Sequence, residues 1–147
     1  CDRRQRQMCI RDSNLFNRDG GPEPPVGISV PQAMYDDFVK ISEPIQKIRP
    51  DYPFEVKVRE PRKRPTRMGG TDASVFAIEG VPTLGFTTED FKGYDFDYGE
   101  IWHTERDLYT KNIPEYQEHT ATVTAIIALG VANLDKQLSR EGLYTEE

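Results

Sequence analysis

Two stretches with apolar residues at helical spacing lie on either side of a stretch that alternates with period two. The first predicts a helix within residues 31–49, with an apolar stripe formed by Met34, Phe38, Ile41 and Ile45. Residues 54–59 alternate between apolar and polar, which predicts a strand with one buried face. Pro114 opens a second, longer helix, whose stripe is formed by Val123, Ile126, Ile127, Val131 and Leu134. These patterns predict helices that pack on a sheet.

Shorter signals predict the remaining elements, which are a strand end at residues 15–17, a loop at 20–27, a helix at 73–78 and a strand at 81–86. Thr71 or Asp72 can cap the short helix, and Gly80 closes it. The resulting order of strand, helix, strand, helix, strand, helix is typical of an α/β fold.

Functional sites in α/β folds gather at the carboxyl ends of strands. Asp19 follows the first strand, and His103 ends the loop after the strand at residues 81–86. We therefore expect one edge of the sheet to bring Asp19, Asp72 and His103 together. A histidine followed four residues later by Asp107 can act as a metal ligand or as a proton-transfer group.

Two further features allow a structural interpretation. His119 lies four residues after Glu115 in the long last helix, which predicts an ion pair on the protein surface. The loop at residues 87–100 is acidic and aromatic, and its rings belong to Phe91, Tyr94, Phe96 and Tyr98. These rings can line a substrate pocket or can form an ordinary packed loop.

The composition limits the possible partners. The 147 residues carry a net charge of −6, which argues against nucleic acid as a partner because its phosphates require clustered basic residues. One basic cluster occurs in a proline-broken stretch and consists of Lys57, Arg59, Arg62, Lys63, Arg64 and Arg67. It contains no interleaved aromatic residues, so we interpret it as a solvated loop. No apolar run approaches the roughly 20 residues that a membrane-spanning helix needs.

The first thirteen residues look foreign. Residues 3–13 can be translated, with a permitted codon at every position, from a sequence that resembles a widely used transposon-based sequencing adapter. We expect the native protein to begin near Asn14 and its N-terminal part to be missing. Cys1 and Cys9 both fall in the suspect segment, so they do not indicate a redox compartment.

Three short motifs follow one another along the chain. They are Asn17-Arg18-Asp19-Gly20, then Gly69-Gly70-Thr71-Asp72 with Gly80-Val81-Pro82 after it, and finally the run from His103 to Asp107. In order and spacing they resemble the C-terminal half of the two-zinc exopeptidases of the aminopeptidase Y and carboxypeptidase Q type. The resemblance covers residues 14–138 and implies part of a three-layer α/β/α sheet, truncated at its N-terminus, with a frayed tail at 139–147.

The resemblance also implies metal ligands and an activity. It assigns Asp19 and His103 as zinc ligands, one for each of two Zn²⁺ ions, and Asp107 as the carboxylate that supports His103. Zinc accepts both donor types, and a pair of zinc ions can polarise a peptide carbonyl and activate water. The implied function is that of an exopeptidase, most simply an aminopeptidase, that acts on peptides.

The remaining residues of the implied site form its rim, and they are Thr71, Asp72, Tyr98, Trp102 and Asp107. Trp102 stands where some members carry a tyrosine that stabilises the oxyanion, so this role is vacant or belongs to Tyr98. The general base of the family is a glutamate in the missing upstream part, so no catalytic residue is assigned here. With one ligand for each metal, we expect this chain alone to be inactive and to bind no zinc tightly.

Two other functions stay open. One is a glutaminyl-cyclase-like acyltransferase that uses a single zinc, and the other is a non-catalytic binding domain of the same fold. Intact upstream ligands would favour the peptidase, and their loss would favour the binding domain. Family members are often secreted or periplasmic, but the sequence does not indicate the compartment or the oligomeric state.

Overall fold

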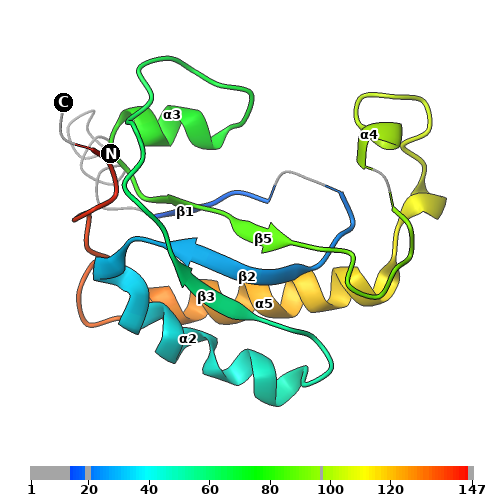
Figure 1. Cartoon of the computed structure of the whole chain (residues 1–147), viewed down its shortest axis with the longest axis horizontal. Helices are drawn as coiled ribbons and strands as arrows, with labels where there is room; N and C mark the ends of the chain where they lie inside the picture. The colour runs from blue at the N-terminus through cyan, green and yellow to red at the C-terminus, as the bar shows by residue number, and fades with distance from the viewer. Residues whose placement is uncertain (1–13, 19–20, 97, 146–147) are drawn as a thin grey trace, which may run out of the picture.

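A computed structural model describes residues 14–18, 21–96 and 98–145 (Figure 1). Helices and strands are mixed along the chain, so the general α/β class is confirmed. The strands are β1 (Leu15–Phe16), β2 (Pro25–Val30), β3 (Glu55–Val58), β4 (Thr83–Leu84) and β5 (Phe86–Thr88). The helices are η1 (Gln32–Met34), α2 (Tyr35–Ile48), α3 (Ala73–Ile78), α4 (Tyr98–Ile101), η2 (Tyr109–Lys111) and α5 (Pro114–Ala132).

β2 is the central strand of a three-stranded sheet with the order β3-β2-β5. It runs parallel to β3, with Ile28 opposite Val56, and antiparallel to β5, with Ile28 opposite Phe86. β1 and β4 form a separate parallel pair in which Phe16 lies opposite Leu84. Within the described residues, the sheet is therefore mixed and small.

The expected loop at residues 20–27 was wrong from Pro25 onward, where the central strand β2 begins. β2 starts at Pro25, where a proline is tolerated because the first residue of a strand need not donate to the ladder. Gly27 lies so close to β3 that a Cβ atom there would overlap the carbonyl oxygen of Glu55. Pro25 and Gly27, which predict a loop, thus have places in this strand. Pro25 stands at its start, and Gly27 stands where it comes closest to β3.

The residues at 81–86 form two short strands in different sheets, not the single strand that was expected. β4 pairs with β1, and β5 pairs with β2, with Gly85 between them. β3 occupies residues 55–58 as predicted, but Val58 is 45% exposed. The expected buried face of this edge strand is therefore only partly covered.

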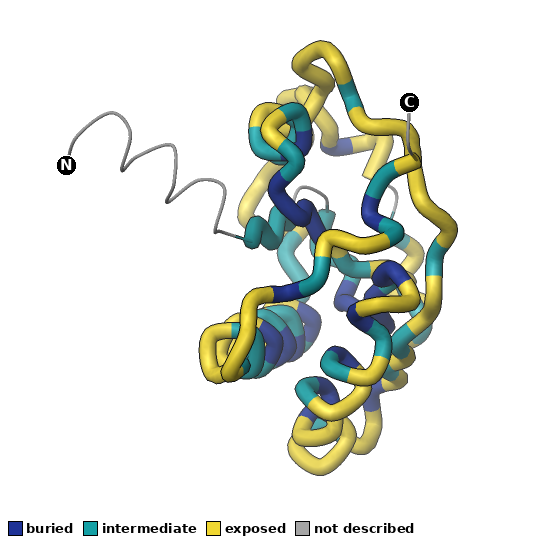
Figure 2. Tube along the Cα trace, turned by 90° about the vertical axis from the view of Figure 1, so that its left-hand side faces the viewer, coloured by how far each residue is buried: buried dark blue, intermediate teal, exposed yellow. Residues whose placement is uncertain are grey.

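Helices α2 and α5 lie side by side on one side of the three-stranded sheet (Figure 1). The predicted stripe of the first helix is confirmed, because Met34, Phe38 and Ile45 are fully buried. In α5, Val123 and Ile127 are fully buried, whereas the last residue of the predicted stripe lies beyond the helix end. The buried residues follow the contact between the two helices and β2 (Figure 2).

Gly130 sets how closely α5 approaches α2. A Cβ atom at this position would overlap both Cγ atoms of Ile41. A glycine inside a helix costs about 1 kcal/mol relative to alanine, and here close helix packing offsets that cost.

We expect Gly130→Ala to lower the free energy of unfolding by about 1 kcal/mol, because overpacking of roughly 1–3 kcal/mol exceeds the gain in helix propensity. In an Ile41→Ala background the same substitution is expected to be neutral or stabilising, since the obstructing Cγ atoms are gone. Urea denaturation of the four variants of this cycle measures the coupling. Equal effects of Gly130→Ala in both backgrounds would contradict the packing explanation.

The residues after α5 differ from the expected frayed tail. Leu143 is 1% exposed and belongs to the core, and Leu138 is 4% exposed. Tyr144 forms a β-bridge with Arg62, and the Thr145 N–H donates to the Arg62 carbonyl oxygen at 3.0 Å. This segment therefore closes one end of the core.

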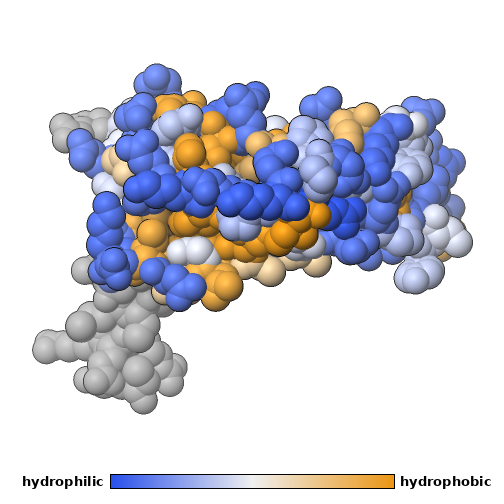
Figure 3. All heavy atoms as spheres, turned by 90° about the horizontal axis from the view of Figure 1, so that it is seen from below, coloured by the Kyte–Doolittle hydropathy of each residue, from blue (hydrophilic) through white to orange (hydrophobic). Residues whose placement is uncertain are grey.

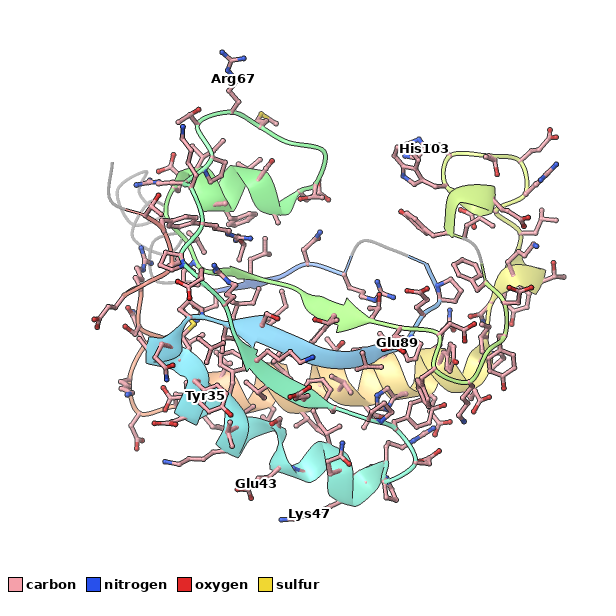
Figure 4. The ribbon with its side chains drawn as sticks, in the orientation of Figure 1. Tyr35, Glu43, Lys47, Arg67, Glu89 and His103 are labelled. Carbon is pink, nitrogen blue, oxygen red and sulfur yellow. The ribbon has the colours of Figure 1, made fainter. Side chains whose placement is uncertain are left out.

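Two residues of the basic cluster are structural. The Arg62 guanidinium donates to the Thr83 carbonyl oxygen at 3.0 Å, and the Arg64 Nε donates to the Ile78 carbonyl oxygen at 3.0 Å. They tie the loop at residues 61–67 to β4 and α3, while Arg67 projects from the molecule (Figure 4).

Hydrophobic side chains gather on both sides of a hydrophilic band on the face that carries α2 and α5 (Figure 3). At β1, Leu15 and Phe16 are half-buried, and the Phe16 ring lies 6.5 Å from the Phe38 ring and 6.4 Å from the Phe86 ring. The apolar surface of β1 is thus partly covered. Among the described residues, no helix has both the length and the apolar character to cross a bilayer.

Candidate functional site

An open cleft of about 930 Å³ lies between three parts of the chain. One wall comes from Arg18, Gly21 and Pro22, before the central strand, and another from α4 and the turns after it. The third wall is the first turns of α5. The lining residues used below are Arg18, Gly21, Tyr98, Trp102, His103, Asp107, Leu108, Tyr109, Lys111 and Asn112.

His103 lies in this cleft because of the way α4 ends. Its backbone adopts the left-handed conformation, with φ of +56°, at the second position after the last residue of α4, where helices often end in this way. Thr104 holds the turn, since its hydroxyl donates to the Glu100 carbonyl oxygen at 2.7 Å. The ring of His103 is exposed and contacts the Trp102 ring edge-on at a centroid distance of 4.8 Å. In Figure 4 it projects from the side of α4 that faces α3.

Asp107 lines the same cleft as His103 but does not support it directly. Its N–H donates to the Thr104 carbonyl oxygen at 3.3 Å, and no hydrogen bond or ion pair joins its carboxylate to His103. In the part of the chain that the structure describes, both side chains therefore keep their donor and acceptor atoms available.

Thr71 and Asp72 do not line the cleft. They precede α3, which stands at the opposite end of the sheet from α4 (Figure 1). α3 begins at Ala73 as predicted, but the Asp72 side chain makes no capping hydrogen bond. The structure thus brings Tyr98, Trp102 and Asp107 together with His103 and places the other two rim residues elsewhere.

The second expected zinc ligand, Asp19, lies outside the described residues. Over residues 14–18, 21–96 and 98–145, no group of three or more metal-binding side chains comes together. His103 has the chemistry of a metal ligand, since its exposed imidazole nitrogens make no hydrogen bond in this region. The described side chains fit one imidazole contribution to a metal site and not a complete one.

Arg18 holds the approach to β2 and shapes one end of the cleft. Its guanidinium donates to the carbonyl oxygens of Gly21 and Glu23, both at 2.6 Å. The Glu23 carboxylate in turn accepts a hydrogen bond from the Thr88 hydroxyl at 3.0 Å. An arginine one residue before an expected ligand gave no sequence signal for this structural role.

The aromatic loop divides between the two interpretations. Phe91 and Tyr94 pack against the Tyr116 ring, at centroid distances of 5.9 and 5.2 Å, so this part is an ordinary packed loop. Tyr98, by contrast, lines the cleft. Phe96 lines a second, smaller cavity of about 190 Å³ beside η2.

Glu115 anchors that loop to the start of α5. Its carboxylate accepts hydrogen bonds from Lys92 at 2.5 Å, from Tyr94 and from Tyr52 at 3.0 Å. The hydrogen bond from Lys92, together with that from Tyr94, lowers the pKa of Glu115 to about 2. The same bond raises the pKa of Lys92. Burial, with the hydrogen bond to Asp90, raises the pKa of Tyr116 to about 12.

His119 is not the surface partner of Glu115, so that prediction was wrong. It is fully buried, and its ring stacks on the Tyr52 ring at a centroid distance of 4.0 Å. Its Nε2 lies 3.0 Å from the Pro25 carbonyl oxygen, and its Nδ1 has no partner among the described residues. Burial lowers the pKa of His119 below its ordinary value.

Comparison of the chain with family models, curated proteins and solved structures gave no match.

Proposed function

We propose that this chain is the C-terminal part of a zinc-dependent exopeptidase, most simply an aminopeptidase, in which His103 binds one of two zinc ions. The observation that carries the proposal is the shared cleft. Arg18 and Gly21, which flank the other proposed ligand in the sequence, line the same cleft as His103 and Asp107. The three motifs support membership of this family. The cleft supports a shared site, because residues of the first and the last motif line it.

The side chains of the cleft suit peptide hydrolysis. Zinc ions bound by the complete ligand set would polarise the scissile carbonyl and activate a water molecule. Asp107 lines the same cleft as His103, and its carboxylate is the group that would hold the imidazole. Tyr98 lines the cleft, and its hydroxyl can donate to the developing oxyanion.

The test uses a longer protein that contains this chain and an upstream segment with the remaining ligands and the glutamate base. We expect it to release N-terminal residues from peptides and to bind two zinc ions. His103→Ala should lower kcat/KM by about 10³-fold or more, because it removes a ligand of the zinc ion that would polarise the scissile carbonyl. Glu105→Ala, an exposed neighbour on the same turn, is the matched control and should change kcat/KM by less than about twofold.

Three results would contradict the proposal. One is full activity of the His103→Ala variant, and another is submicromolar zinc binding by the present chain alone in calorimetry. The third is a longer protein that binds one zinc ion and cyclises N-terminal glutamine without releasing residues, which would indicate the acyltransferase.

A further inference from the structure

We propose that the free edge of β3, together with the basic stretch that follows it, binds an extended acidic segment of another protein as an added strand. We call this surface the β3 edge, and it consists of Val56, Lys57, Val58, Arg59, Lys63 and Arg67. None of these residues lines the cleft beside His103. The proposal does not rest on the peptidase function, since it involves neither zinc nor a substrate.

In the described residues, β3 has a neighbouring strand on one side only. It is the outer strand of the order β3-β2-β5, and its pairing with β2 continues to Arg59, whose N–H donates to the Val30 carbonyl oxygen at 2.9 Å. Backbone groups of successive strand residues point alternately to the two sides, so those of Val56 and Val58 point away from β2. Outside the ladder with β2, no backbone hydrogen bond involves either valine in this part of the chain. Such a row of free N–H and C=O groups can accept a further strand.

Unpaired positive charge is concentrated beside this edge. Residues 57–67 contain six basic residues and one acidic residue, Glu60, although the whole chain has a net charge of −6. Lys57 pairs with the exposed Glu55 at 3.1 Å. Among the residues that the structure describes, the other five cations of the stretch form no ion pair with a carboxylate. A strand added here therefore meets cations that are free to pair with acidic side chains.

The surroundings of Arg59 favour an anionic partner. Arg59 is half-buried, and Arg62 nearby is held in place because its guanidinium donates to the Thr83 carbonyl oxygen. Burial, together with the charge of Arg62, lowers the pKa of Arg59. Two cations that lie close together repel each other, so a carboxylate brought to Arg59 relieves this repulsion and a further cation increases it.

The same features select a polypeptide over other anionic partners. The outward N–H and C=O groups of Val56 and Val58 match the backbone of an extended peptide, which neither a membrane nor a nucleic acid provides. A large anionic surface would also meet the rest of this acidic chain, whereas a short acidic segment meets the basic stretch alone. A second copy of the chain would bring the same cations to the edge, so like charges oppose pairing of two copies.

The test measures binding of the present chain to a labelled peptide by fluorescence anisotropy. The probe is Glu-Val-Glu-Val-Glu-Val, blocked at both ends, and it is compared with Lys-Val-Lys-Val-Lys-Val and with the acidic peptide N-methylated at every backbone amide. We expect the acidic peptide to bind at least about tenfold more tightly than either of the others, because one lacks the charge and the other lacks the donors of the ladder.

Variants separate the contribution of charge from that of the backbone. Replacement of both Arg59 and Lys63 by glutamine should weaken binding of the acidic peptide by about fivefold or more. Arg106→Gln, which changes an exposed arginine in the turns after α4, is the matched control and should leave binding unchanged. Val58→Pro removes an outward N–H, which an edge strand tolerates, and should abolish binding. Circular dichroism checks that each variant is folded, and the N-methylated peptide tests the same contact if Val58→Pro is not.

Equal affinity for the acidic and the basic peptide would overturn the proposal. Equal affinity for the N-methylated peptide would overturn it as well, since attraction between charges would then explain binding without strand addition. A dimer of the chain that Val58→Pro dissociates, observed by sedimentation, would assign the edge to a second copy instead. None of these outcomes bears on the peptidase proposal, and failure of the longer protein to cleave peptides would leave the β3 edge unaffected.

Discussion

Gly27→Ala is expected to lower the free energy of unfolding by about 3 kcal/mol. The added Cβ atom would overlap the carbonyl oxygen of Glu55, which is backbone and cannot rotate away. β3 would have to move from β2, and the register that places Gly27 opposite Glu55 would lose its hydrogen bonds. Urea denaturation followed by circular dichroism measures the loss.

Gly85→Ala is the matched control for this substitution. Gly85 also lies beside sheet strands, but nothing occupies the space within 4 Å of a Cβ atom there. Its replacement is expected to be neutral or to stabilise by up to about 1 kcal/mol, because alanine restricts the unfolded chain. If both substitutions cost the same free energy, close approach of β2 and β3 does not explain the requirement for Gly27.

The helices could be predicted because their signals are local. The stripe from Met34 to Ile45 and the proline at the start of α5 lie within single elements. The central strand could not be predicted, because the roles of Pro25 and Gly27 depend on a neighbour about thirty residues away. β2 begins at Pro25 and comes closest to β3 at Gly27. Considered without that neighbour, proline and glycine predict a turn.

The candidate site was predictable to the extent that its residues lie close together in the sequence. Tyr98, Trp102 and Asp107 belong to the same turn region as His103, and all four line one cleft. Asp72 was expected there from topology and from the family resemblance, and the structure places it before α3, outside the cleft. Tyr109 and Asn112 also line the cleft and were missed, because neither belongs to a motif.

His119 illustrates how a helical spacing can mislead. The four-residue separation from Glu115 is that of an ion pair, but it equally describes two residues on a buried helix face. Glu115 is engaged by Lys92 and two tyrosines, and His119 stacks on Tyr52 beneath them. Only the distant strand β2, which provides the Pro25 carbonyl, makes a buried histidine favourable at this position.

The second large effect is a loss of stability on mild acidification that depends on His119. A carbonyl oxygen can only accept, so the Nε2–H of His119 donates to Pro25 and Nδ1 is the unprotonated nitrogen. Protonation would place a charge and an unpaired N–H in the core. Because burial lowers the pKa of His119 below 6.5, its contribution to stability is complete above pH 6.5 and is lost as the pH falls below that value. The loss from this one proton is at most about 1.4 kcal/mol for each pH unit.

The charged groups around His119 do not reverse this pH dependence. Arg49 and Lys92 lower its pKa further, and Asp51 opposes them. The pKa of Glu115 is about 2, so the stability that it contributes is lost only as the pH falls from 4.5 toward 2, outside the range from pH 8 to pH 5. Loss of stability between pH 6.5 and pH 5 therefore reports on His119.

His119→Phe keeps a ring on Tyr52 and removes the titration. It leaves the Pro25 carbonyl without a donor, so stability at pH 8 is expected to fall by about 1–2 kcal/mol. The additional loss on going to pH 5 should then be much smaller than in the unmodified chain. The matched control is His103→Ala, which removes the other histidine, an exposed one, and should leave the pH dependence unchanged. Urea denaturation at pH 8, 7, 6 and 5 measures all three proteins. A steep pH dependence that persists in His119→Phe, or disappears in His103→Ala, would show that the acid sensitivity has another origin.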